Sequence, residues 1–524
     1  MTSPKFMLER IKNNLKVIVI SILPPTIITL SILSWYFKPL SSEVFLGFCQ
    51  HEQVVYMALA RAFAERGFLI FYPSPYAVEE FPRVLTHLLF VITGALLKLG
   101  IPFLWQWYAI RLIFGFAMFY LGYMILKEFF EGKFLKYSFL TLCFGGGLAY
   151  VFAIIGSFFT NFSFNQAFVF VEYPYDWWFT NLFRVTYYPL EVFSHVLMFA
   201  SILFFLRKNY KLSSLFYFLT WWSHPFTGAT LLCIYALYFI AERDKNYKPF
   251  LIISLIFIFY YRIFLYMFPL SRNIAENWKF LYNARHLGLE RYPSAWGIFI
   301  LTPIILGRRI KNLLCERSSQ ERKNRFIIYW IIAELILINN DLIPFFQGYQ
   351  PMHFTRGNLF FPLVVLTFLL LRMERKKPIL LILIFLLSLP DNLIFLHNFV
   401  EIGGEVSPAL KSYQYDPLRI TAEEYDILKK LEEVEETQVI LSYNGIISLM
   451  IPAYTKHKTV LGQYNYVPYF GEKVKDAGEY LRTFDRSVLD KYNISMVILP
   501  RKFENNVASG GILYEGKNWI IYKI

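Results

Sequence analysis

Long apolar runs separated by short polar segments make up the first 396 residues of the chain. A helix of about 20 apolar residues crosses a bilayer core of about 30 Å, and runs near this length recur along the sequence. The runs are residues 17–37, 105–126, 137–158, 190–206, 212–222, 226–240, 248–268, 294–307, 326–343, 358–371 and 379–396. The pattern predicts an all-α polytopic membrane protein with about 11 transmembrane helices.

Two apolar segments differ from an ordinary membrane-crossing run. Residues 83–104 contain Arg83, His87 and Lys98, so this stretch either lies along the membrane interface, as we predict, or crosses the membrane in place of one of the other runs. The first run is longer than the core of a secretory signal and is followed by Tyr36 and Phe37, where a cleavage site needs small residues. We therefore interpret this run as an uncleaved signal anchor.

Composition agrees with a membrane protein. Of the 524 residues, 56% are hydrophobic and 20% aromatic, and the mean hydropathy is +0.41. A soluble domain of this length does not need so much apolar surface, so a soluble globular protein is excluded.

Lys and Arg are distributed unequally between alternate loops. If residues 1–16 are cytoplasmic, the loops on that side carry 24 Lys and Arg in 63 residues, against nine in 115 residues on the other side. Because positively charged loops stay in the cytoplasm, we predict a multi-pass protein of the cell membrane with a cytoplasmic N-terminus and an extracytoplasmic C-terminus.

The formal net charge of +14 does not indicate nucleic-acid binding, because the excess lies in the predicted cytoplasmic loops. Anionic lipid headgroups are the natural partner there, so the expected partner is the lipid bilayer and not a nucleic acid. The four cysteines, Cys49, Cys143, Cys233 and Cys315, follow neither a disulfide nor a metal-binding spacing.

The C-terminal 128 residues have a different pattern. Thr421 precedes a helix with acids in its first turn, and short β-rich runs follow at 438–443, 458–461, 495–500, 511–514 and 519–522. We therefore predict two domains: residues 1–396, a transmembrane domain with a long outer loop at 38–82, and residues 397–524, a small extracytoplasmic α/β domain.

The first outer loop is rich in ionisable residues, which are functional candidates when they lie against a membrane. Glu52, Tyr56 and Ala60 are spaced to share one helical face, and Arg61 with Glu65 makes a second pair at helical spacing. Position just after the first span favours Glu52 as the functional carboxylate. The other interpretation is an interfacial helix with solvated charges.

Three further places on the predicted outer side carry candidate chemistry. Glu172 and Asp176 lie among Tyr and Trp residues, which suits a sugar ring or, alternatively, an aromatic belt. His224 lies at the tip of a predicted hairpin, where it either contacts a phosphate or forms part of a structural kink. Arg356 is the sole cation of residues 344–357, and its guanidinium suits phosphate binding or interfacial anchoring.

This layout resembles the GT-C type membrane glycosyltransferases, which include protein O-mannosyltransferases, aminoarabinose transferases and oligosaccharyltransferases. Their first outer loop commonly reads Asp-Glu-x-x-Tyr, then Ala-Arg, a Gly and a Pro-led apolar run. The matching residues are Glu52, Gln53, Tyr56, Ala60, Arg61, Gly67 and Pro82. Glu replaces Asp at position 52, and Gln replaces the next acid. The tail also resembles the outer domain of many prokaryotic members.

The resemblance implies inverting transfer of a sugar from a polyprenyl-phosphate donor to a glycan, lipid or protein acceptor. It implies that Glu52 is the catalytic base, and that Arg356 and His224 bind the donor phosphate. Glu172 or Asp176 is expected to position the acceptor or to share a divalent metal such as Mg or Mn. Some family members need a metal and others do not, so the metal stays undecided.

Two other function classes fit parts of the pattern. A non-catalytic scaffold of envelope assembly would explain the missing acid at Gln53. A transporter would explain intramembrane charges such as Arg262 and Glu334, although the spans show no two-fold repeat.

Overall fold

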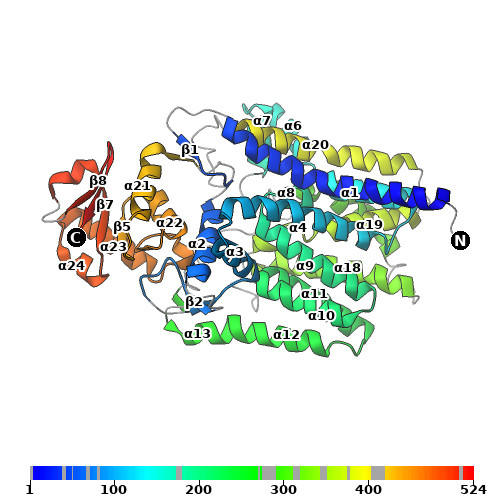
Figure 1. Cartoon of the computed structure of the whole chain (residues 1–524). Coiled ribbons are helices and arrows are strands. Elements are labelled where there is room, and N and C mark those ends of the chain that lie inside the picture. Colours follow the sequence, from blue (N-terminus) through cyan, green and yellow to red (C-terminus); the bar gives the residue numbers. More distant parts are fainter. Residues whose placement is uncertain are drawn as a thin grey trace. The chain divides into compact units, whose positions relative to one another are not determined.

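The computed structural model describes residues 4–37, 43–49, 51–65, 71–79, 83–172, 180–269, 272–273, 291–310, 319–342, 351–373, 378–402, 419–506 and 511–524 (Figure 1). The chain is mostly helical and has a small C-terminal sheet. It forms two compact units. The first contains Met1–Ser31, Trp107–Phe257 and Tyr282–Glu401, and the second contains Ile32–Gln106, Ile258–Leu281 and Ile402–Ile524.

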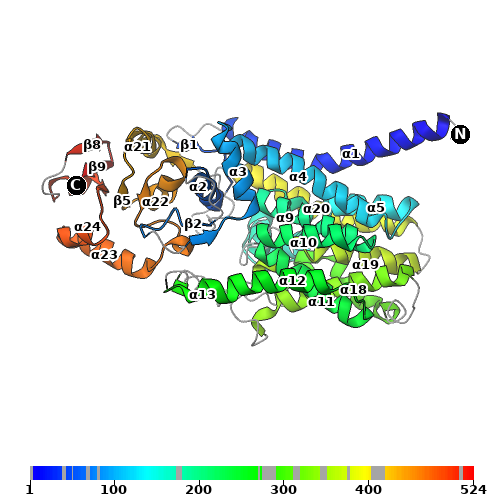
Figure 2. The same ribbon diagram turned by 60° about the horizontal axis from the view of Figure 1, so that its bottom comes forward.

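The first unit is a helical bundle. Its helices are α1 (Pro4–Leu33), α4 (Phe103–Leu126), α5 (Gly132–Phe144), α6 (Ala149–Phe159), α7 (Phe164–Glu172), α8 (Leu182–Val185), α9 (Pro189–Leu206), α10 (Tyr210–Ser223), α11 (Pro225–Glu242), α12 (Lys248–Ile258), α15 (Tyr292–Trp296), α16 (Ile298–Ile305), α18 (Ser319–Ile338), η6 (Asn340–Leu342), η8 (Pro351–Phe354), α19 (Phe360–Met373) and α20 (Pro378–Ile402). Helices α9, α10, α11, α18 and α19 pack in that order, each against the next (Figure 2).

Helices lie at all of the predicted apolar runs. Among the described residues, six helices are long and apolar enough to cross a membrane, and a bent pair adds a seventh if it counts as one span. Helix α19 is buried from Phe360 to Leu371, whereas α12 exposes Leu251, Ile252 and Leu255, as a helix that faces lipid does. A multi-pass membrane protein follows from these helices, and the total of about 11 crossings stays a prediction.

Charged residues of the predicted cytoplasmic loops meet at one end of the bundle. Glu128 forms ion pairs with Arg207 and Lys323, both at 2.8 Å. Glu242 forms an ion pair with Arg325 at 2.6 Å. The loops that carry these residues therefore lie on the same side of the bundle, as the charge distribution predicts.

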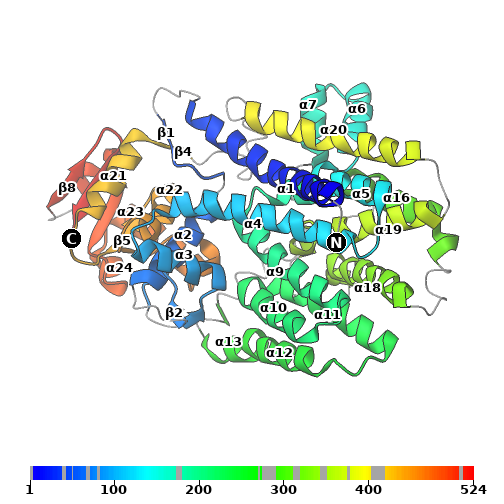
Figure 3. The same ribbon diagram turned by 45° about the vertical axis from the view of Figure 1, so that its right-hand side comes forward.

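The predicted run 137–158 is interrupted. Helices α5 and α6 are bent by 53° at a break that contains Gly145, Gly146 and Gly147, and α6 packs against α7 (Figure 3). A side chain at Gly147 would overlap the backbone oxygen of Ser294. The Gly147 N–H also donates to Asp391 Oδ2 of α20 at 2.8 Å. The break therefore lets α20 and the segment at Ser294 approach the backbone closely.

The second unit contains the first outer loop and the tail. Its elements are η1 (Ser34–Phe37), β1 (Glu43–Phe45), α2 (His51–Glu65), β2 (Phe71–Pro73), β3 (Arg83–Leu85), α3 (Leu88–Lys98), η4 (Phe259–Phe264), α13 (Leu265–Met267), β4 (Arg419–Thr421), α21 (Ala422–Glu432), β5 (Val439–Ser442), α22 (Gly445–Tyr454), β6 (Lys458–Thr459), η9 (Tyr464–Tyr466), α23 (Phe470–Thr483), α24 (Arg486–Lys491), β7 (Met496–Pro500), η10 (Arg501–Asn506), β8 (Ile512–Glu515) and β9 (Trp519–Lys523).

The stretch 83–104 does not form a single membrane-crossing helix. It begins with β3, which pairs with β2, and continues as α3, which has 11 residues. At 1.5 Å per residue, such a helix covers only about half of a bilayer core. Helix α3 packs on α2 within the same unit. This arrangement agrees with the prediction that the stretch does not cross the membrane.

The tail forms an α/β fold. Its sheet has the order β6-β5-β7-β9-β8, in which β5 is parallel to β6 and β7, and β9 is antiparallel to β7 and β8. All five strands coincide with predicted β-rich runs. Thr421 caps α21, because its hydroxyl accepts from the Glu424 N–H while the Glu424 carboxylate accepts from the Thr421 N–H.

The tail packs against the first outer loop. Strand β1 pairs with β4, the Tyr76 hydroxyl donates to the Leu449 carbonyl at 2.8 Å, and Lys473 forms an ion pair with Glu79 at 2.8 Å. These contacts agree with the prediction that the first outer loop and the tail lie on the same side of the membrane. The boundary at residue 397 and the extracytoplasmic location stay predictions.

The tail contains a buried histidine, His457. Its ring links two segments, because His457 Nε2–H donates to the Leu431 carbonyl at 2.8 Å and Nδ1 accepts from the Gln438 N–H at 3.1 Å. Burial lowers the pKa of His457 below its usual value. The unfolded tail therefore binds the proton more readily than the folded tail.

We expect the tail of the wild-type protein to lose stability as the pH falls below about 6.5, the pKa of an unperturbed histidine. Amide hydrogen exchange in β5 and β6 of the full-length protein measures this loss, because opening exposes both strands. The His457→Gln variant should lose the pH dependence between pH 5 and 7, even if its overall stability is lower. Equal pH dependence in the two proteins would contradict the assignment.

Candidate functional site

Three segments of the first unit converge at the end of the bundle opposite to Glu128 and Glu242. They are the start of α9, the tip between α10 and α11, and the segment from η8 to Asn358. The sequence predicts the chain before α9, the tip at His224 and residues 344–357 to be outside the membrane, and Glu191 and His195 begin the predicted apolar run 190–206. The convergence places their polar side chains in one cluster, which we call the Glu191 cluster and define as Glu191, His195, His224, His353 and Arg356.

Glu191 owes its position to the start of α9. Pro189 is the first residue of this helix, where its fixed φ angle suits a helix start and no N–H is needed. Glu191 therefore lies in the first turn, where the helix dipole favours a carboxylate. Its side chain is 1% exposed, so it needs charged or hydrogen-bonding partners.

Arg356 is the closest partner of that carboxylate. Its Nη1 lies 2.5 Å from Glu191 Oε1, and its side chain is 10% exposed. The guanidinium also lies 5.9 Å from the centre of the Tyr188 ring. Arg356 is therefore held inside the bundle end by a carboxylate and an aromatic ring, and it does not extend to the surface as an interfacial anchor does.

His224 joins two helices, because it is the C-cap residue of α10 and the N-cap residue of α11. Its Nδ1 lies 2.7 Å from Thr227 Oγ1, and its Nε2 lies 3.6 Å from Glu191 Oε1. The predicted hairpin with His224 at its tip is therefore present. The ring faces the same carboxylate as Arg356, so the structure brings together the two residues predicted to bind the donor phosphate.

Two more histidines complete the cluster. The His353 ring stacks on Phe226 with a centroid distance of 4.0 Å and an angle of 8°. His195 Nδ1–H donates to the Glu191 carbonyl at 2.7 Å, one helical turn away. Among the described residues, one group of three His, Cys, Asp or Glu side chains has ligand atoms close enough to hold a metal ion. This group is Glu191, His224 and His353, whose ligand atoms all lie within 4.8 Å of one another.

The sequence predicts no role for Glu191, His195 or His353. Glu191 and His195 lie in the predicted apolar run 190–206, and His353 lies within residues 344–357. A local signal existed for one pair, because Glu191 and His195 are four residues apart and share a helical face. No local signal connects them to His353, because the connection depends on how α9 packs against distant segments.

Glu52 lies in the second unit, in the first turn of α2. The buried face of this helix packs on α3 and α22, and Tyr56 stacks on Phe90 at 5.2 Å. Glu52 itself is half-buried. Burial, and then the negative charge of Glu52, raise the pKa of the Tyr466 phenol, so the Glu52 carboxylate lies near Tyr466 of the same unit.

Gln53, which replaces an acid of the family pattern, has a structural role. Its side chain is 1% exposed, and its Oε1 accepts from the Cys49 N–H at 3.2 Å. Arg61 and Glu65 form the predicted pair at helical spacing, at 3.3 Å. Of the other predicted residues, Glu172 is the last residue of α7. Asp176, Gly67 and Pro82 lie outside the described residues.

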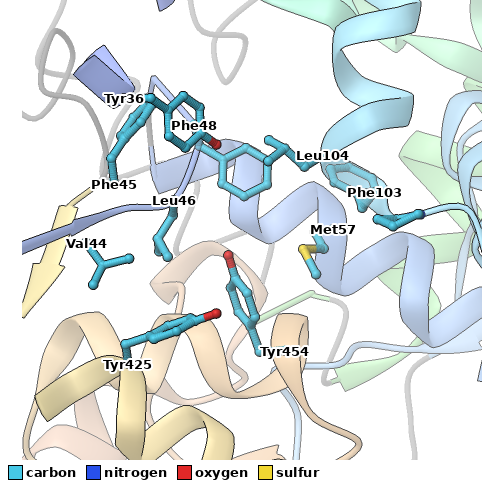
Figure 4. A pocket seen from close by; sticks show the side chains of 11 residues that line it. Tyr36, Val44, Phe45, Leu46, Phe48, Met57, Phe103, Leu104, Tyr425 and Tyr454 are labelled. Carbon is cyan, nitrogen blue, oxygen red and sulfur yellow. The ribbon is translucent and has the colours of Figure 1, made fainter. Parts of the chain in front are cut away.

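The second unit also contains an aromatic pocket of about 290 Å³. Figure 4 shows Tyr425 and Tyr454 on one side of the pocket, opposite Tyr36, Phe45 and Phe48. Walls of aromatic rings with tyrosine hydroxyls suit a ligand that is apolar with a few polar groups. The pocket lies beside Met57 of α2, the helix that carries Glu52.

No protein-family model matches the chain, and the search of curated proteins found no match. The chain is similar to the Archaeoglobus fulgidus oligosaccharyltransferase with a tethered acceptor peptide containing the NVT sequon, at 14% identity and a TM-score of 0.46 over 94% of this chain and 69% of that chain. The apo form of that protein has 14% identity and a TM-score of 0.46, over 94% of this chain and 70% of that chain. Its complex with Zn and sulfate has 14% identity and a TM-score of 0.44, over 94% of this chain and 68% of that chain.

Proposed function

We propose that this chain is a membrane glycosyltransferase that moves a sugar from a polyprenyl-phosphate donor to an extracytoplasmic acceptor. The observation that carries the proposal is that the buried Arg356 and His224 both face Glu191, at the bundle end that we predict to face outward. A buried guanidinium fixed by a carboxylate is a preorganised site for an anion, and the leaving group of such a donor is a phosphate.

In the proposed reaction, Glu52 accepts the proton of the acceptor hydroxyl or amide as the acceptor attacks the anomeric carbon. The bond from that carbon to the phosphate oxygen breaks, and its electron pair leaves with the phosphate. Arg356 and His224 stabilise the negative charge that develops there. Base and leaving group act on opposite faces of the sugar, so the configuration inverts.

Glu172 and Asp176 complete the proposal as residues that position the acceptor or share a divalent metal. They flank aromatic residues that suit the C–H faces of a sugar ring. The acceptor class is a glycan, a lipid or a protein. Of these, a protein acceptor is also what one of the similar structures contains, as a tethered peptide.

The test is transfer of radiolabelled sugar in proteoliposomes, with a panel of polyprenyl-phosphate sugars and a mixture of acceptors. We expect the wild-type protein to move label from at least one carrier. The same vesicles, loaded with free sugar, test for a transporter. Flux without transfer, or neither activity from folded protein, would overturn the proposed function.

The Arg356→Lys variant tests the phosphate site. Lysine keeps the positive charge next to Glu191 but loses the planar fork that binds phosphate with two hydrogen bonds. We expect its KM for the donor to rise roughly ten- to hundred-fold, which corresponds to the loss of one hydrogen bond to a charged group. The control is Arg486→Lys, since Arg486 is exposed on α24 in the tail. An unchanged KM in the Arg356 variant would contradict the role.

A further inference from the structure

We propose that Glu191, His224 and His353 bind one divalent transition-metal ion. The three residues come from α9, from the tip between α10 and α11, and from η8. All three belong to the first unit, so the site depends on one compact body of the chain. The family resemblance of the sequence implies a metal only at Glu172 and Asp176.

The distances between ligand atoms fit such an ion. Zinc binds nitrogen and oxygen ligands at about 2.0–2.2 Å, which separates two ligands of a tetrahedral ion by about 3.4 Å. His224 Nε2 and Glu191 Oε1 are already 3.6 Å apart. The third ligand atom, on His353, lies within 4.8 Å of the others, so the three atoms are close enough to surround one ion.

Contacts behind the ligands orient both rings. His224 Nδ1 contacts Thr227 Oγ1 at 2.7 Å. When Nδ1–H donates to this hydroxyl, the lone pair of Nε2 faces the Glu191 carboxylate, and the gap between two acceptors suits a cation. His353 is fixed by its stacking on Phe226. Metal-binding histidines are usually held by such outer contacts.

The ligand types select the class of metal. Two imidazole nitrogens and one carboxylate suit zinc, cobalt, manganese or iron, whereas magnesium and calcium prefer oxygen ligands alone. Three protein ligands leave at least one coordination position for water or substrate, as in catalytic zinc sites. The site therefore fits a zinc-like ion with an open position.

The neighbouring Arg356 connects the metal to an anion. The charges of a divalent ion and of the guanidinium together exceed that of the single Glu191 carboxylate. In a buried site this excess favours a bound anion, so metal binding and phosphate binding strengthen each other. This last step rests on the proposed function, since it identifies the anion as the donor phosphate. With the ion bound, His224 would act on that phosphate through the metal, because both of its ring nitrogens are then engaged.

The test measures metal binding in the absence of donor. Full-length protein, purified in detergent without a polyhistidine tag and stripped with a chelator, is titrated with Co²⁺, whose visible absorption reports coordination, and then with competing Zn²⁺. We expect one ion per chain. The His353→Phe variant removes the ligand atom but keeps an aromatic ring against Phe226, and should bind more than about 100-fold more weakly.

The matched control is His397→Phe, because His397 is exposed on α20 and takes no part in the cluster. This variant should bind like the wild type. Wild-type protein that binds no stoichiometric ion, or a His353→Phe variant that binds as tightly as wild type, would overturn the metal site. Since the titration contains no donor, its outcome is independent of the transfer assay, and each proposal can fail alone.

Discussion

The Glu52→Gln variant is expected to transfer sugar about 10²- to 10⁴-fold more slowly than the wild type, which is the usual contribution of a general base. Glutamine has nearly the same shape as glutamate, so α2 should keep its packing on α3 and α22. The amide cannot accept a proton from the acceptor. The loss should therefore appear in the initial rate at saturating donor and acceptor, while the Kd for the donor stays unchanged.

Two further variants of the same helix sharpen this test. Glu65→Gln makes the same chemical change on α2 at an exposed position, and should leave the rate unchanged. Glu52→Asp restores the residue of the family pattern and should keep a measurable rate. If the Glu52→Gln variant transfers sugar within about threefold of wild type, Glu52 is not the base, and Glu172 and Asp176 become the next candidates.

Local patterns were enough to predict the apolar helices of the bundle and the five strands of the tail sheet. Apolar runs identified the helices because a membrane imposes a length and a uniform apolar character. The tail strands were predicted because β-rich runs such as Val439–Ser442 and Met496–Pro500 stand between polar segments. Thr421 with Glu424 marked the start of α21, since a capping box is a pattern within four residues.

The composition of the Glu191 cluster could not be predicted in the same way. Arg356 and His224 were candidates because each is conspicuous in its own loop. Their shared partner Glu191 lies 165 positions from Arg356 and contacts it only because α9 packs near that segment. A charge in a loop gives no sign of which buried partner it meets, so the ion pair depends on tertiary structure.

The break between α5 and α6 is an intermediate case. Three consecutive glycines from Gly145 to Gly147 were visible in the sequence, and a glycine run inside an apolar segment is a possible helix end. What the sequence does not contain is the reason for the break. That reason is Asp391, which is far along the chain and accepts hydrogen bonds from the Gly147 and Ala149 N–H groups.

Asp391 also neutralises a buried arginine. Its Oδ2 lies 2.8 Å from Arg184 Nη2, and both side chains are 2% exposed. Arg184 Nε donates to Asn392 Oδ1 at 2.9 Å, and the guanidinium lies 4.3 Å from the centre of the Phe395 ring. The carboxylate therefore joins α8, α20 and the start of α6 in one polar network inside the bundle.

The Asp391→Asn variant is expected to lose about 3–5 kcal/mol of stability, because it leaves the charge of Arg184 buried without a counter-charge. Replacing both partners, with Arg184→Met and Asp391→Leu, should recover part of this loss, since an apolar pair needs no desolvation of charge.

Unfolding in mixed micelles with increasing dodecyl sulfate measures the stabilities of these variants. Glu433→Gln, which breaks an exposed ion pair with Lys430, is the control and should change stability by less than about 0.5 kcal/mol. An Asp391→Asn variant as stable as this control would contradict the role of Asp391 as the stabilising counter-charge of Arg184.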